Sequence, residues 1–231
     1  MSSIAINGGA NRTAAFYESV VGKKAVMAAT GFVLCGFVLG HMAGNLQVYQ
    51  GEAKLNHYAA LLQGLGGGLW AIRGVLLLCA VLHGWTAFQL WRLKNDARPQ
   101  PYVKKASIAT TYAARTMLWS GPIIGAFLVY HILHFTTGGA HPDFRAGEVY
   151  RNVVTGFRNP AASVFYIIAN ILLAIHLYHG VWSMFQSLGV NHPQYTPKLK
   201  LLAKAYAWVV GLGNVSIPIA VLTGVVGASV K

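Results

Sequence analysis

The stretch GFVLGHMAGNLQ, residues 36–47, lies near the far end of an apolar segment that begins after Lys24. This segment has no acidic or basic residue over a length of more than twenty residues. A helix of about 20 residues, rising about 1.5 Å per residue, crosses the hydrocarbon core of a membrane. His41 lies inside this segment, where an imidazole finds no water and needs a partner. A functional role for His41 is therefore the first hypothesis.

Glycines flank this histidine at a regular spacing. Gly36, Gly40 and Gly44 repeat every four residues, which clears one face of the helix of side chains. A second helix, or a broad and flat ligand, can approach such a face closely. For this segment alone two interpretations stay open: a helix-packing seam with a hydrogen-bonded histidine, or a ligand site.

The composition indicates an all-α membrane protein with several spans. Of 231 residues, 55% are hydrophobic and 10% are charged, which lies outside the range of soluble domains. The net charge of +13 comes from basic residues in short loops and not from a basic face interleaved with aromatic residues, so no nucleic-acid partner is expected. Cys35 and Cys79 lie in apolar segments as small hydrophobic residues. The chain has no Cys-x-x-Cys-His motif, which excludes covalent haem attachment.

We expect one transmembrane domain of five helices surrounded by lipid. The expected spans cover about residues 25–49, 69–93, 115–137, 161–187 and 205–230. Residues 50–68 are expected to form a short interfacial helix, because their apolar side chains share one face. Residues 138–159 are predicted to be a polar loop, and residues 190–204 a basic loop.

The distribution of basic residues predicts the orientation. Lys and Arg are twice as numerous in the N-terminal tail and in the loops after the second and fourth spans as on the opposite side. Because cytoplasmic loops carry an excess of Lys and Arg, the amino terminus is expected in the cytoplasm and the carboxyl terminus outside.

This topology converts the position of each histidine into a depth. His41 and His131 each lie about 16 residues from the cytoplasmic start of a span, so they share a level toward the outer face. His83 and His176 each lie about 10 residues before the cytoplasmic end of a span that runs the other way, so they share a second level nearer the inside. Two stacked pairs of imidazoles are what two bis-histidine haems b require. We therefore predict these four histidines as iron ligands.

Small residues lie one turn beyond three of these histidines. Gly44, Ala87 and Gly180 are expected to leave that face of each helix open to a porphyrin.

Other metals fit the pattern less well. A structural zinc site needs four ligands in tetrahedral reach, and a di-iron bundle needs Glu-x-x-His pairs, whereas these spans contain no carboxylate. A proton relay stays open, although relays in membranes usually use Asp or Glu.

Four further residues are candidates for contact with the haems. His134 and His179 lie three residues after their neighbours, on a related helix face, so either could replace its neighbour as ligand. A hydrogen bond to a haem propionate or to the backbone is the role we favour for both. Arg73 and Arg115 lie at span ends on opposite sides and suit pairing with propionates, with ordinary snorkelling as the alternative.

Several motifs follow one another in a characteristic order along nearly the whole chain. They are Gly22-Lys23-Lys24, Thr30-Gly31, His41-Met42-Ala43-Gly44-Asn45-Leu46-Gln47, His83-Gly84, Asn95-Asp96-Ala97-Arg98-Pro99, Arg115-Thr116-Met117, Ser120-Gly121, His131 with Phe135, and His176 with Gly180 and Trp182-Ser183. Together they resemble the five-helix, dihaem cytochrome b subunit of succinate dehydrogenase and fumarate reductase. The motifs at 41–47 and 95–99 are the most specific of the set.

The resemblance implies a membrane anchor in the bacterial inner membrane. A flavoprotein subunit with FAD and an iron–sulfur subunit would dock on its cytoplasmic face and carry the dicarboxylate chemistry, and a higher oligomer of the whole complex stays open. This chain would hold two haems b and a quinone, with menaquinone favoured by the resemblance. By position, His83 and His176 match the haem nearer the iron–sulfur subunit, and His41 and His131 match the distal haem.

The family pattern also bears on the choice between neighbouring histidines. The spacing to Gly121 and Phe135 favours His131 over His134. Gly180 and Trp182 favour His176 over its neighbour His179.

The quinone pocket and the enzyme partner stay open. Glu52, His57 and Gln63 could line a quinone pocket or form an ordinary solvated loop, and the direction of electron flow is not legible in this chain. One alternative is a cytochrome b subunit of a hydrogenase or formate dehydrogenase. Another is a haem-free anchor or transporter whose histidines bind substrate or protons.

Overall fold

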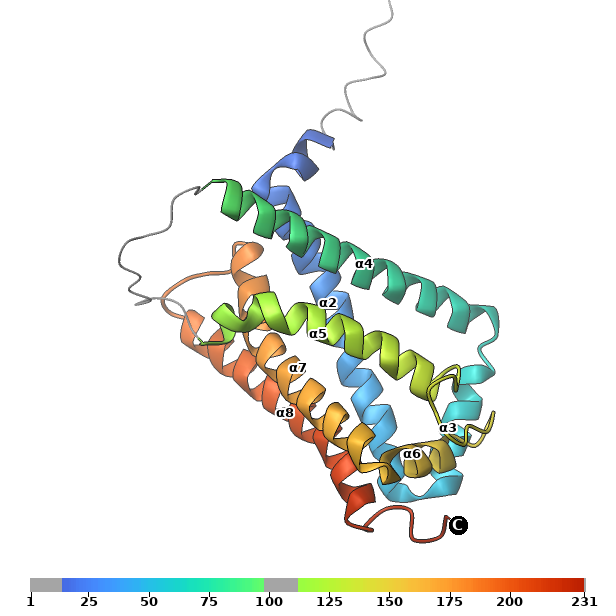
Figure 1. The fold of residues 1–231 in the computed structure, drawn as a ribbon. Helices are drawn as coiled ribbons and strands as arrows, with labels where there is room; N and C mark the ends of the chain where they lie inside the picture. The colour runs from blue at the N-terminus through green and yellow to red at the C-terminus, as the bar shows by residue number, and fades with distance from the viewer. Residues whose placement is uncertain (1–13, 98–111, 231) are drawn as a thin grey trace, which may run out of the picture.

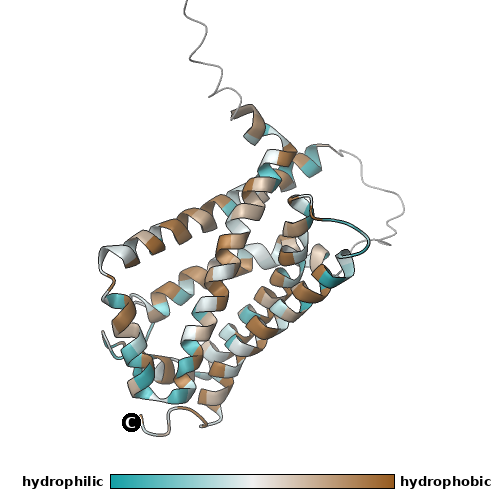
Figure 2. Cartoon of the chain, turned by 180° about the vertical axis from the view of Figure 1, so that it is seen from behind, coloured by the Kyte–Doolittle hydropathy of each residue, from teal (hydrophilic) through white to brown (hydrophobic). Residues whose placement is uncertain are grey.

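A computed structural model describes residues 14–97 and 112–230, and within these ranges the secondary structure is helical, without strands. The long helices are α2 (Val20–Asn45), α4 (Gly67–Asp96), α5 (Tyr112–Phe135), α7 (Pro160–Ser187) and α8 (Thr196–Leu222) (Figure 1). Each is long and apolar enough to cross a membrane, and apolar residues run along all of them (Figure 2). The all-α class and the five apolar helices are therefore confirmed.

The neighbours of each long helix define two diagonals. α2 packs against α4 and α7, and α7 packs against α5 and α8. The pairs α2–α5, α4–α7 and α4–α5 lack such extensive packing among the described residues. We name α2–α5 and α4–α7 the two diagonals of an arrangement of four helices in which α4 and α5 do not pack closely. α8 packs outside it, against α7 and less extensively against α2.

One end of the bundle, which we name the capped end, is covered by short elements. They are the 3-10 helix η1 (Leu46–Gln50), α3 (Glu52–Gln63) and α6 (Val149–Arg158), which lie together in Figure 1. α3 is the short helix expected after the first span. Its Asn56 Oδ1 accepts a hydrogen bond from the backbone N–H of Tyr150 on α6 at 2.9 Å, and Leu55 is fully buried beneath it. We name the opposite end, where α4 and α7 end, the open end.

Two sequence-based boundaries are wrong. The segment predicted as a polar loop at 138–159 contains α6, whose Tyr150, Val154 and Phe157 are buried at helical spacing. A polar composition concealed this short amphipathic helix.

The last helix runs from Thr196 to Leu222 instead of 205–230, so most of the predicted basic loop is helical. Pro197 suits a first helical turn, because its missing N–H needs no partner there. After Leu222 the chain turns back through Gly224 and Gly227, which have φ of 77° and 93°.

Some sequence-based expectations fall outside the described residues. They concern the basic residues and prolines counted for the orientation and for the 95–99 motif, namely Arg12, Arg98, Pro99, Pro101, Lys104, Lys105 and Lys231.

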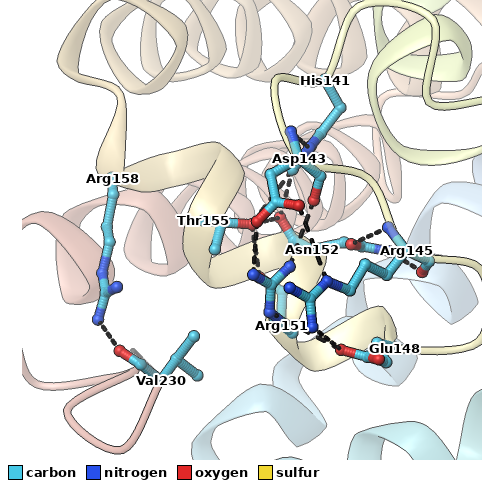
Figure 3. Close-up of polar contacts among 9 residues, drawn as sticks. All are labelled: His141, Asp143, Arg145, Glu148, Arg151, Asn152, Thr155, Arg158 and Val230. Carbon is cyan, nitrogen blue, oxygen red and sulfur yellow. Dashed lines mark hydrogen bonds and ion pairs between the residues drawn. The ribbon is translucent and has the colours of Figure 1, made fainter.

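Charged residues join the elements of the capped end (Figure 3). Arg151 on α6 pairs with Asp143 and Glu148, and Arg145 pairs with the same two carboxylates. Arg158 donates to the carbonyl oxygens of Gly227 and Val230 at 2.9 and 2.6 Å, which holds the C-terminal turn against α6.

The contact between α7 and α8 depends on a glycine. A Cβ at Gly211 would lie 2.8 Å from the Cβ of Ala174, a backbone-fixed atom that cannot move aside. We expect Gly211→Ala to lower the free energy of unfolding by about 1–3 kcal/mol, the usual effect of overpacking. Gly74→Ala on α4 is the matched control, since nothing lies within 4 Å of its Cβ position and alanine favours helix. Unfolding in detergent monitored by circular dichroism would measure both. Equal stability of the two variants would contradict the packing assigned to Gly211.

The Asp143–Arg151 pair predicts a pH dependence of the capped end. The hydrogen bond from Arg151 holds the pKa of the Asp143 carboxyl below its ordinary value of 3.8. The pair therefore stabilises the folded state above that value, and the stabilisation is lost as the pH falls through the depressed pKa. We expect Asp143→Asn to reduce the melting temperature at pH 6 and to lose its effect at strongly acidic pH. A double-mutant cycle with Arg151→Gln checks that the two residues act as one pair; strict additivity at pH 6 would contradict it.

Candidate functional site

The first predicted histidine pair joins α4 to α7. The ring centroids of His83 and His176 lie 6.4 Å apart, with 58° between the ring planes. These helices form one of the two diagonals, so the imidazoles meet across the interior where the helices themselves do not pack closely.

The second predicted pair joins α2 to α5 along the other diagonal. The ring centroids of His41 and His131 lie 5.7 Å apart, and the ring planes are nearly perpendicular at 88°. Depth along the helices predicted the same two pairs, and the structure brings the members of each pair together.

The spacing of both pairs suits one metal ion between two imidazoles. A bond of about 2.0 Å from metal to each nitrogen, with each ring centre about 1.1 Å behind its nitrogen, separates the ring centres by about 6 Å. No group of three or more His, Cys, Asp or Glu side chains in residues 14–97 and 112–230 has the geometry to hold a metal ion. A bis-histidine haem needs two protein ligands, and the two pairs supply that number twice.

The hydrogen bonds of His83 fix which nitrogen carries its proton. Its Nδ1 lies 3.1 Å from the carbonyl oxygen of Met27 and 3.3 Å from Oγ1 of Thr30. The Thr30 hydroxyl donates its own hydrogen to the backbone of α2, at 2.8 Å from the Val26 carbonyl oxygen, so both neighbours of Nδ1 accept. Nδ1 therefore carries the hydrogen, and Nε2 keeps the lone pair that a metal requires.

Two more of the four paired histidines, His176 and His131, also have a hydrogen-bond partner at Nδ1. Nδ1 of His176 lies 3.3 Å from Oγ of Ser120 on α5, and Nδ1 of His131 lies 3.3 Å from Oη of Tyr166 on α7. In both cases the orienting group comes from a helix other than the one that carries the opposing histidine. His41 stacks on Phe37, with ring centroids 5.3 Å apart. An orienting bond at Nδ1 is the usual arrangement around a metal-binding imidazole.

Several glycines near the paired histidines leave the backbone open. A Cβ at Gly84, Gly180, Gly36 or Gly40 would find no atom within 4 Å. The expectation for Gly44 is wrong, because a Cβ there would meet the Tyr58 ring of α3. Gly44 therefore serves the packing of α2 against the capped end.

His134 is built into the protein interior and does not face a second histidine across the bundle. Only 1% of it is exposed, and its Nδ1 lies 3.1 Å from Oη of Tyr166. Its ring packs against Phe135 and His141, with centroids 4.2 and 5.0 Å away. This packing leaves His131 as the better placed ligand of the two.

The remaining predicted residues lie apart from the pairs or at the ends of the bundle. His179 is partly buried one turn from His176 on α7. Arg73 is exposed toward the capped end, with its guanidinium 4.9 Å from the centre of the Trp70 ring, and Arg115 is exposed at the start of α5. Their pairing with propionates stays a prediction.

Sequence reasoning missed the orienting role of Tyr166, Ser120 and Thr30. Thr30 and Ser120 entered only as parts of family motifs, and Tyr166 did not enter. The available signal was the presence of hydroxyl groups inside apolar spans, where each needs a partner.

Comparison of the chain with protein-family models, with curated proteins and with solved structures finds no match.

Proposed function

We propose that this chain is the membrane-anchor cytochrome b subunit of a succinate:quinone oxidoreductase. It would carry electrons between an iron–sulfur subunit and a quinone, with menaquinone favoured by the motif resemblance. The observation that carries the proposal is the pair of facing imidazoles on each diagonal of the bundle, at 5.7 and 6.4 Å. Both donor sets fit a bis-histidine haem b.

Four histidines would hold the haems, whose iron supplies one-electron transfer when bound. His83 and His176 would hold the haem nearer the open end, and His41 and His131 the haem nearer the capped end. Thr30 and the Met27 carbonyl orient His83. Ser120 orients His176, and Tyr166 orients His131. In a membrane, the lipid around these apolar spans would exclude water from both sites.

The separation of the two levels suits electron transfer along the bundle axis. His83 contacts α2 at Met27 and Thr30, about 11 to 14 residues before His41, which corresponds to about 16–21 Å of helix. Ser120, the partner of His176, likewise precedes His131 on α5 by about 11 residues, or about 16 Å.

Charge supports an orientation with the open end in the cytoplasm of a bacterial cell. Basic residues such as Lys94, Arg115 and Lys198 gather there. Among the described residues, the ion pair at this end joins Lys23 to Glu18. At the capped end, Arg145 and Arg151 pair with Asp143 and Glu148, while Lys54, Arg73 and Arg158 have no acidic partner in the ion pairs of the described residues. The flavoprotein and iron–sulfur subunits would dock at the open end.

The proposal predicts about two haems b per chain and a defined response to mutation. Changing His41, His83, His131 or His176 to Ala should each remove about one haem, because each site needs both imidazoles. The two members of a pair should lose the same spectral component. A pyridine haemochrome assay with redox-resolved optical spectra measures this, and the exposed His57→Ala and His192→Ala serve as matched controls.

The same material separates the alternatives. Copurification of a flavoprotein with covalently bound FAD supports the succinate:quinone enzyme, whereas a hydrogenase or formate dehydrogenase partner would replace only that part of the proposal. A wild-type chain without reduced α bands would refute the haem assignment and leave an anchor or transporter.

A further inference from the structure

The hydroxyl of Tyr166 lies between two histidines of α5. Its oxygen is 3.3 Å from Nδ1 of His131 and 3.1 Å from Nδ1 of His134. All three side chains lie within one aromatic cluster, and 4% of Tyr166 is exposed. One hydroxyl has a single hydrogen, so it can donate to only one of these nitrogens and must accept from, or leave unbonded, the other.

The nitrogen to which the Tyr166 hydroxyl donates its hydrogen decides whether His131 can bind a metal. If Tyr166 donates to Nδ1 of His131, the ring proton of a neutral His131 must sit on Nε2, which then has no lone pair for iron. If Tyr166 donates to Nδ1 of His134, its oxygen accepts the Nδ1 hydrogen of His131. Nε2 of His131 then keeps the lone pair that a metal requires.

The packing around His134 holds its ring beside the Tyr166 hydroxyl. The ring is stacked on Tyr130 with centroids 5.2 Å apart and is enclosed by Phe135 and His141. His141 has both nitrogens committed elsewhere: Nδ1 accepts from the backbone N–H of Asp143 at 3.1 Å, and Nε2 donates to the Asn152 carbonyl oxygen at 2.9 Å. Among the described residues, Tyr166 is thus the hydrogen-bond partner of Nδ1 of His134.

We propose that His134 is a positioning residue that fixes, through the Tyr166 hydroxyl, which nitrogen of His131 carries the ring proton. The inference deepens the proposed function and rests on it, because it assigns the role of His134 toward the haem at the capped end. His134 acts here without contact to the haem iron or its propionates.

Three variants separate this role from general packing. His134→Asn keeps an acceptor oxygen close to the place of Nδ1. His134→Leu removes the acceptor and frees Tyr166 to donate to His131. Tyr166→Phe removes the hydroxyl and with it any bias between the two ring nitrogens.

The three variants should differ in their effect on the affinity and midpoint potential of the haem held by His41 and His131. His134→Asn should retain it with the wild-type midpoint potential. Tyr166→Phe and His134→Leu should bind it about 10- to 100-fold more weakly, the usual loss when a group orienting a metal ligand is removed. Any haem retained there in Tyr166→Phe should have a raised midpoint potential, because His131 donates less electron density without its acceptor. The haem held by His83 and His176 reports correct folding in the same sample.

A second readout tests the proton position without any haem. Nitrogen-15 NMR of histidine-labelled full-length chain from haem-deficient cells should show His131 protonated at Nδ1 in the wild type and in His134→Asn, and at Nε2 in His134→Leu. Unchanged potential and unchanged proton position in His134→Leu would overturn the inference. Haem absent from the wild type would refute the proposed function, while the NMR result would still decide the role of His134.

Discussion

The constraint on which this structure depends is the hydrogen-bonding capacity of imidazole in an apolar bundle. A neutral ring has one donor and one acceptor nitrogen, and neither finds water inside a membrane. For three of the four paired histidines the protein supplies a partner at Nδ1, from the Met27 carbonyl, Ser120 or Tyr166. Among the described residues, no hydrogen bond reaches Nε2 of these three rings. A metal between two such nitrogens would satisfy both at once.

The helix packing leaves the two diagonals without close contact. Small residues allow close packing between other helices. Gly211 lets α8 approach α7. Gly31 lets α2 approach the His83 ring, because a Cβ at Gly31 would lie only 3.3 Å from Cε1 of that ring. Close approach of α2 to α4 and α7, and of α5 to α7, places the diagonal helices so that two imidazoles meet between each pair. The same four helices supply both the frame and the four paired histidines.

Sequence reasoning predicted the features that depend on length, polarity and periodicity over long segments. The five apolar helices and the histidine pairs follow from these, since depth in a helix grows by a fixed rise per residue. It failed for features that depend on contacts of individual side chains. The polar residues of α6 concealed a helix that is stabilised by burial of Val154 and Phe157, and the basic start of α8 was taken for a loop although it is continuous with the span. Gly44 was expected to face a ligand because its partner, Tyr58, lies on another helix that periodicity cannot place.

The two histidine pairs differ in what holds them. The pair nearer the open end is oriented by α2 and α5 directly, and the carbonyl acceptor on His83 allows only one position of its proton. The side chains around the pair nearer the capped end pack directly against α6. Tyr166 packs on Phe157 of α6. A Cβ at Gly156 of the same helix would lie 3.0 Å from both His134 and His141. Folding of α6 against the bundle therefore sets the position of Tyr166 and His134, and through them the orientation of His131. The short helix that sequence reasoning missed is the element on which the geometry of the second pair depends.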